Sequence, residues 1–171
     1  MDESTLLRPF FIYPMAKYGV RELSRLTKVD TKTIMKYLQY FTQRNIVVRI
    51  QEKGKFVYYE ANRMSYACHH EKSEAVVKKI IESGLLEYLE NEVKPKTIIL
   101  FGSVAKGTYH LGSDIDLFVQ ANYKQIDLSK FNKKIGFPVQ LFFEPKLQNL
   151  TKGLLENIYN GMVLVGSIEV V

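Results

Sequence analysis

The 171-residue sequence has one cysteine, no long apolar run and no Gly/Ser linker or internal repeat. A single cysteine, Cys68, excludes an intramolecular disulfide framework and favours a reducing cytoplasm. No stretch approaches the roughly 20 apolar residues of a membrane-spanning helix, and the acidic start lacks the basic beginning of a secretory signal. We therefore expect a cytoplasmic protein that does not enter a membrane. The 46% hydrophobic and 25% charged residues are typical of a globular fold.

The net charge of +6 is distributed unevenly along the chain. Residues 1–70 hold 12 basic and 6 acidic residues, whereas residues 71–171 hold 12 of each. All six arginines lie in the first part, and a guanidinium group can read phosphate and guanine edges with paired hydrogen bonds. The asymmetry indicates either a polyanion-binding first domain or a solvated basic face without a partner. It also predicts two domains, 1–70 and 71–171. The spacing of Val77, Ile81 and Leu85 predicts that a helix joins them.

Apolar spacing in the first domain predicts an α-helical unit that ends in a β-hairpin. Leu23 and Leu26 are expected to face the core from the first of two closely spaced helices, and Asp30 or Thr31 can cap the second. Two β-prone runs around Gly54 predict the hairpin. The predicted elements are helices over residues 20–27 and 31–44 and strands over residues 46–51 and 56–60.

This order of elements resembles the winged helix-turn-helix domains of prokaryotic transcription regulators over residues 17–63. The resemblance implies that the second helix enters the major groove of DNA and that the hairpin lies along the backbone as a wing. RNA is a less favoured partner, and winged helices also serve as protein-binding or dimerising modules. The candidate DNA contacts are Lys32, Lys36, Tyr40, Arg44, Arg49, Lys53 and Lys55. Charge reversal of Lys36 and Arg44 is expected to weaken duplex binding.

The second domain contains TIILFGSVAKGT at residues 97–108 and LGSDIDLFV at residues 111–119. The first motif predicts a short buried strand, then a turn at Gly102 and Ser103 into a helix near Val104. Glycine allows a backbone to approach a ligand closely, and a helix N-terminus presents free N–H groups. The pattern therefore indicates a phosphate-binding turn, although an ordinary strand-to-helix turn has the same pattern.

In the second motif, Asp114 and Asp116 alternate with apolar residues, so on a strand both carboxylates share one face. They are separated by about 7 Å along the strand, a spacing that suits one or two Mg²⁺ (or Mn²⁺) ions bridging a triphosphate. The alternative is a pair of exposed acids on an edge strand.

Together the two motifs resemble the nucleotidyltransferase superfamily that includes DNA polymerase beta and kanamycin nucleotidyltransferase, and in particular its minimal prokaryotic domains, over about residues 95–166. The resemblance predicts an α+β protein in which the winged helix-turn-helix domain (three helices plus β-hairpin) precedes a small mixed-sheet nucleotidyltransferase domain. It implies that a nucleoside monophosphate passes from a Mg–nucleoside triphosphate to an acceptor hydroxyl. Asp114 and Asp116 would then be catalytic and metal-binding, and the nucleotide-binding residues would be Gly102, Ser103, Lys106 and Ser113.

The family's third carboxylate falls at Gln140 in the stretch FPVQLFFE. A neutral amide cannot act as a general base, and Glu144 lies about 13 Å further along a strand. Two hypotheses follow: a nucleotidyltransferase that works with two aspartates, or a non-enzymatic transcription regulator whose degenerate domain senses a nucleotide or dimerises. The resemblance to minimal domains further implies a toxin–antitoxin or autoregulated system with a helical ribonuclease partner. A homodimer is also expected.

Overall fold

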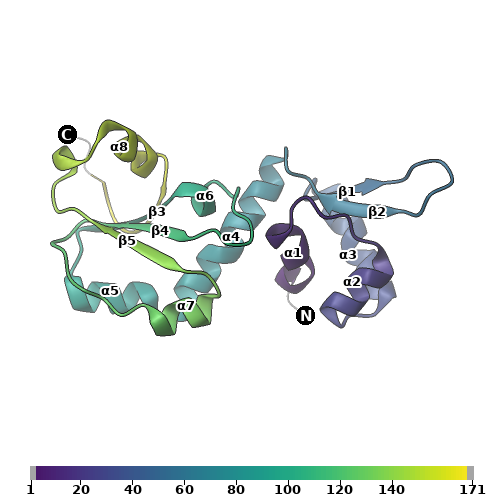
Figure 1. The fold of residues 1–171 in the computed structure, drawn as a ribbon, viewed down its shortest axis with the longest axis horizontal. Helices are drawn as coiled ribbons and strands as arrows, with labels where there is room; N and C mark the ends of the chain where they lie inside the picture. The colour runs from purple at the N-terminus through teal and green to yellow at the C-terminus, as the bar shows by residue number, and fades with distance from the viewer. Residues whose placement is uncertain (1–2, 169–171) are drawn as a thin grey trace. The chain divides into compact units, whose positions relative to one another are not determined.

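The computed structural model describes residues 3–168, which form two compact units (Figure 1). Unit 1 runs to Lys72 and also includes Tyr109–Leu111, and the rest of the described chain forms unit 2. The boundary at Lys72 lies within helix α4 (Tyr66–Ser83). Within the described residues, no helix is both long and apolar enough to cross a membrane.

Unit 1 contains three helices, a two-stranded antiparallel hairpin and the first part of α4. The elements are α1 (Glu3–Ile12), α2 (Val20–Thr27), α3 (Thr31–Gln43), β1 (Val47–Ile50) and β2 (Tyr58–Ala61). The two predicted helices are confirmed to within one residue, and both strands are shorter than predicted. Tyr18, before α2, exchanges two backbone hydrogen bonds with Tyr59 of β2, at 2.8 and 2.9 Å, and so fixes the hairpin against the helices.

Helix α3 begins where a side chain satisfies its free N-terminal amides. Asp30 is the N-cap, and its carboxylate accepts a 2.9 Å hydrogen bond from the Thr33 amide. The apolar stripe of this helix is buried as predicted, whereas Leu26 of α2 is 57% exposed, so its predicted core position is wrong. Helix α2 extends for only eight residues, and Leu23 is its buried anchor.

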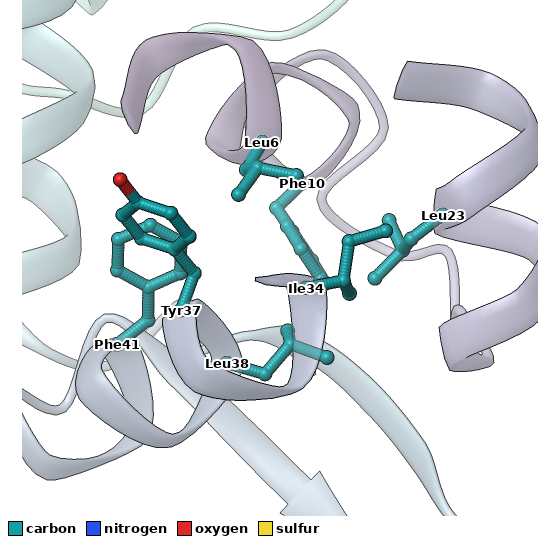
Figure 2. A pocket seen from close by; sticks show the side chains of 7 residues that line it. All are labelled: Leu6, Phe10, Leu23, Ile34, Tyr37, Leu38 and Phe41. Carbon is teal, nitrogen blue, oxygen red and sulfur yellow. The ribbon is translucent and has the colours of Figure 1, made fainter. Parts of the chain in front are cut away.

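A small gap lies between α1, α2 and α3 (Figure 2). It has no room for a water molecule, and all but one of its lining side chains are aliphatic or phenyl groups. This is therefore the packed core of unit 1 and not a ligand site. The lining residues are Leu6, Phe10, Leu23, Ile34, Tyr37, Leu38 and Phe41.

Unit 2 contains a four-stranded mixed sheet in the order β5-β4-β3-β6. Strand β3 is buried along its whole length and pairs antiparallel with β4 and β6, while β4 and β5 are parallel. Helices α5 and α7 lie below the sheet in Figure 1, and α6 and α8 lie above it. The strands are β3 (Thr97–Phe101), β4 (Ile115–Val119), β5 (Val139–Phe143) and β6 (Met162–Gly166). The helices are α5 (Leu85–Val93), α6 (Gly102–Ala105), α7 (Ser129–Ile135), the 3-10 turn η1 (Leu147–Asn149) and α8 (Lys152–Tyr159).

The helix predicted between the two domains is interrupted. Helix α4 ends at Ser83, and Gly84, with a φ of +78°, separates it from α5. A left-handed residue cannot continue a right-handed helix, so the apolar spacing read across Gly84 belongs to two helices.

Candidate functional site

The first part of the site is the turn at the end of β3. Gly102 adopts a φ of +72°, and α6 is a single turn of four residues. A Cβ built at position 102 would overlap the Asp116 Oδ2 atom and lie 3.2 Å from its Cγ. Glycine is therefore required at position 102 for two reasons: the backbone is left-handed, and the Asp116 carboxylate leaves no room for a Cβ. The turn that was predicted to seat a phosphate lies directly against one of the predicted metal ligands.

The two aspartates flank the start of β4. Asp114 immediately precedes the strand, and Asp116 is its second residue and pairs with Phe101 of β3. Because side chains alternate along a strand, Asp114, Asp116 and Phe118 share one face. Phe118 is fully buried and packs in a cluster with Ile158 of α8, which fixes the position of β4 beneath the carboxylates.

The carboxylate of Asp116 is costly to ionise in this position. Partial burial raises the pKa of Asp116 above its usual value, and the nearby Asp114 carboxylate adds to the effect. A cation placed between the two aspartates would stabilise the ionised form of both carboxylates and so offset both effects. The geometry thus concentrates negative charge at one end of the sheet, beside a glycine turn.

Gln140 occupies the position at which the family resemblance places a third carboxylate. In the parallel pairing of β4 and β5, Gln140 is directly opposite Asp116. Its Nε2 donates a hydrogen bond to Asp114 Oδ2. The amide is therefore part of the same cluster of side chains and orients Asp114 without adding a charge.

Glu144 does not take part in this cluster. Its Oε1 accepts hydrogen bonds of 3.0 Å from the Lys146 amide and from Asn149 Nδ2, in the segment that follows β5. The carboxylate is thus used to order a turn.

The remaining predicted nucleotide-binding residues are close in sequence to the turn. Ser103 and Ser113 are half-buried, and Lys106 is exposed just after α6. Lys106 Nζ donates a 3.4 Å hydrogen bond to Asn157 Oδ1 of α8. No sequence pattern indicated Asn157, because it lies 51 residues from Lys106 in a helix without a motif.

The donor set suits a metal that arrives with a polyphosphate. Within residues 3–168 there is no group of three or more His, Cys, Asp or Glu side chains able to hold a metal ion. Mg²⁺ is typically bound by one or two carboxylates together with substrate phosphates and water. Asp114 and Asp116 fit that requirement, and phosphate oxygens would complete the coordination.

The comparison with protein families agrees with this geometry. A family model described as a nucleotidyltransferase domain matches residues 82–165, a range that includes the glycine turn, both aspartates and Gln140. Residues 82–165, which lie in unit 2, are therefore similar to nucleotidyltransferase domains. No curated protein matches the chain significantly.

A second candidate surface lies on α3 of unit 1. The buried stripe of this helix faces α1 and α2, which leaves Lys32, Lys36 and Tyr40 exposed to solvent. Lys53, in the loop of the hairpin, is exposed as well. These four residues of the predicted DNA-binding set are placed where a ligand could reach them.

The other three predicted DNA contacts bond to neighbouring side chains. Arg44 forms a 2.6 Å ion pair with Glu71 of α4 and donates a 3.1 Å hydrogen bond to the Tyr40 hydroxyl. These interactions raise the pKa of Arg44, the hydrogen bond to Tyr40 most strongly. Arg49 donates to Gln51, and Lys55 pairs with Glu52. Glu71 lies 27 residues from Arg44, so the sequence pattern could not have indicated this ion pair.

Proposed function

We propose that unit 2 is a Mg²⁺-dependent nucleotidyltransferase that moves a nucleoside monophosphate from a nucleoside triphosphate to an acceptor hydroxyl and releases pyrophosphate. The observation that carries this proposal is the contact between the Gly102 turn and the Asp116 carboxylate, with Asp114 on the same face. In the proposal, this arrangement would bring a phosphate-accepting backbone and two metal-binding carboxylates to one place.

Each residue has a separate role in the proposal. Asp114 and Asp116 would hold the metal, which neutralises the charge that develops on the phosphate oxygens. The backbone at Gly102 and the hydroxyl of Ser103 would hold the phosphate tail, and Lys106 would reach its outer oxygens. The catalytic effect would come from positioning and electrostatics, on which phosphoryl-type transfer mainly depends.

We further propose that unit 1 is a winged helix-turn-helix domain that binds duplex DNA through α3 and the hairpin. The support is the order of elements and the exposed cations of α3, Lys32 and Lys36, on the side opposite its buried stripe. Arg44, which is paired with Glu71, is better placed to position Tyr40 and α4 than to contact a base.

A second candidate function is a regulator that binds a nucleotide but does not transfer it. The observation that favours it is Gln140, whose neutral amide is directly opposite Asp116. Without a third carboxylate, the acceptor hydroxyl has no general base among these three side chains. In this alternative the nucleotide would change the affinity of unit 1 for its operator.

The first test is calorimetric titration with each of the four ribonucleoside triphosphates, with Mg²⁺ and with chelator. The proposal expects metal-dependent binding that the D114N/D116N double variant loses. D127N is the matched control, because Asp127 is an exposed aspartate of unit 2 that only caps the turn at Ser129. Binding that survives in D114N/D116N, or is absent with all four nucleotides, would contradict the proposed donor site.

A second assay separates the two candidate functions. Transfer of an α-labelled nucleotide to any acceptor establishes the enzyme. Nucleotide binding without transfer, together with a nucleotide-dependent change in DNA affinity, establishes the regulator.

A further inference from the structure

The loop between the two halves of the nucleotide site belongs in part to unit 1. Residues 104–113 connect the Gly102 turn to Asp114, and within them Tyr109–Leu111 clusters with unit 1. The Leu111 amide donates a 3.1 Å hydrogen bond to the carbonyl of Ile12, the last residue of α1. The loop thus leaves the sheet, is bonded to the N-terminal helix and returns at the metal-binding aspartate.

Lys72 holds the same segment from a second side. Its Nζ donates a 2.6 Å hydrogen bond to the Tyr109 carbonyl and lies 4.6 Å from the centre of the Tyr109 ring. Lys72 is 4% exposed and Tyr109 is 2% exposed. Burial lowers the pKa of the Lys72 ammonium group. A lysine is rarely this buried unless its charge is used, and here it is directed at the backbone of one loop.

Two glycines in the left-handed backbone region lie on either side of this anchor. Gly107 has a φ of +65° and Gly112 has a φ of +87°. Gly112 has no atom within 4 Å of a built Cβ, so neighbouring side chains do not fix it. Asp114 follows two residues later. If the Tyr109–Leu111 segment were released, Asp114 would lose the anchor that fixes the start of β4 on that side.

We propose that Lys72 is a positioning residue of the nucleotide site. By fixing Tyr109–Leu111, Lys72 orders the loop before the nucleotide binds. The affinity for the nucleotide is then not weakened by the entropy lost in ordering the loop. Because linkage is reciprocal, a bound nucleotide should also tighten the hold of unit 1 on this segment. The inference rests on the proposed nucleotide-binding function and extends it to a residue outside the nucleotidyltransferase domain.

The test uses the full chain with K72M, which keeps the volume of an unbranched side chain and removes the donor. K78M is the matched control, because Lys78 is an exposed lysine of the same helix whose Nζ lies 3.9 Å from Glu82 Oε1. We expect K72M to weaken binding of the Mg²⁺–nucleoside triphosphate by about threefold to thirtyfold, the range of measured couplings between linked sites. K78M should bind as the wild type does. Thermal unfolding establishes that each variant is folded.

Hydrogen exchange of the wild-type chain gives a readout that does not depend on a variant. Saturating nucleotide should slow exchange of the Leu111 amide, which donates to Ile12. A folded K72M with wild-type affinity overturns the inference, and so does an exchange rate at Leu111 that nucleotide leaves unchanged. If the wild type itself binds no nucleotide, the proposed function fails first and the inference fails with it. Nucleotide binding by the wild-type chain therefore distinguishes failure of this inference from failure of the proposed function.

Discussion

Gly102 and Asp116 lie so close that any side chain at position 102 would overlap the carboxylate. Gly102 directly follows β3, and Asp116 lies in the adjacent antiparallel strand β4, whose pairing with β3 places Phe101 opposite Asp116. The contact joins the two motifs of the sequence into one site.

The first prediction concerns this contact. G102A should lower the free energy of unfolding by about 1–2 kcal/mol, because alanine is strained at positive φ, and it should also abolish Mg²⁺–nucleotide binding by displacing Asp116. The control is G136A, since Gly136 has a φ of +84° and open space around it. G136A should show a similar loss of stability with wild-type binding. Equal binding by G102A and G136A would show that the contact with Asp116 does not matter.

The second prediction concerns Gln140. Q140L removes the hydrogen bond to Asp114 and should weaken metal-dependent nucleotide binding by about tenfold, as loss of a residue that orients a metal ligand usually does. Q140D adds a third carboxylate opposite Asp116 and should strengthen Mg²⁺ binding while destabilising the metal-free protein by charge repulsion. Calorimetry and thermal unfolding with and without Mg²⁺ measure both effects. Unchanged Mg²⁺ affinity in Q140D would place residue 140 outside the metal site.

The third prediction is a pH dependence. The folded state raises the pKa of Asp116, through burial first and Asp114 second, so the folded protein binds this proton more tightly than the unfolded chain does. The contribution of Asp116 to stability is therefore fully present below its ordinary pKa of 3.8 and is lost as pH rises through the raised value. D116N should remove this part of the pH profile and be more stable than the wild type at neutral pH without metal. The prediction is contradicted if denaturant titrations show that the free energies of unfolding of D116N and the wild type change in parallel with pH.

The fourth prediction concerns unit 1. K32E/K36E should weaken duplex DNA binding and reduce the magnitude of the salt-dependence slope by about 2, since each phosphate contact contributes about 0.9. These lysines are preferred to Arg44, because reversing Arg44 would also break the ion pair with Glu71. K133E, at an exposed lysine of α7, changes charge away from the proposed surface and is the control. A wild-type slope in K32E/K36E would exclude α3 as the DNA-contacting helix.

Much of the site was predictable because its signals are local. The run of apolar residues before Gly102 specifies a buried strand, and the alternation around Asp114 and Asp116 places both carboxylates on one face. A glycine at the end of a strand and the alternation of polar and apolar residues can both be recognised within a few neighbouring residues. In the same way, the sequence indicated a helix cap at Asp30 or Thr31, and the structure shows that Asp30 is the cap.

Predictions that relied on spacing across longer segments were less accurate. The helix predicted from the spacing of Val77, Ile81 and Leu85 is divided at Gly84 into α4 and α5. Leu26 was expected to face the core, but it is 57% exposed. Periodicity indicates which residues share a face, but it does not indicate whether another element packs on that face.

The sequence by itself determined the glycine turn, the two aspartates, the basic character of the first 70 residues and the lack of an acid at position 140. Only the tertiary structure decided that Gln140 bonds to Asp114, that Glu71 pairs with Arg44 and that Lys72 holds the loop at Tyr109. The reason is physical. The three contacts join residues that are 26, 27 and 37 positions apart in the sequence, respectively. Residues so far apart are brought together by strand register and helix packing and not by local spacing.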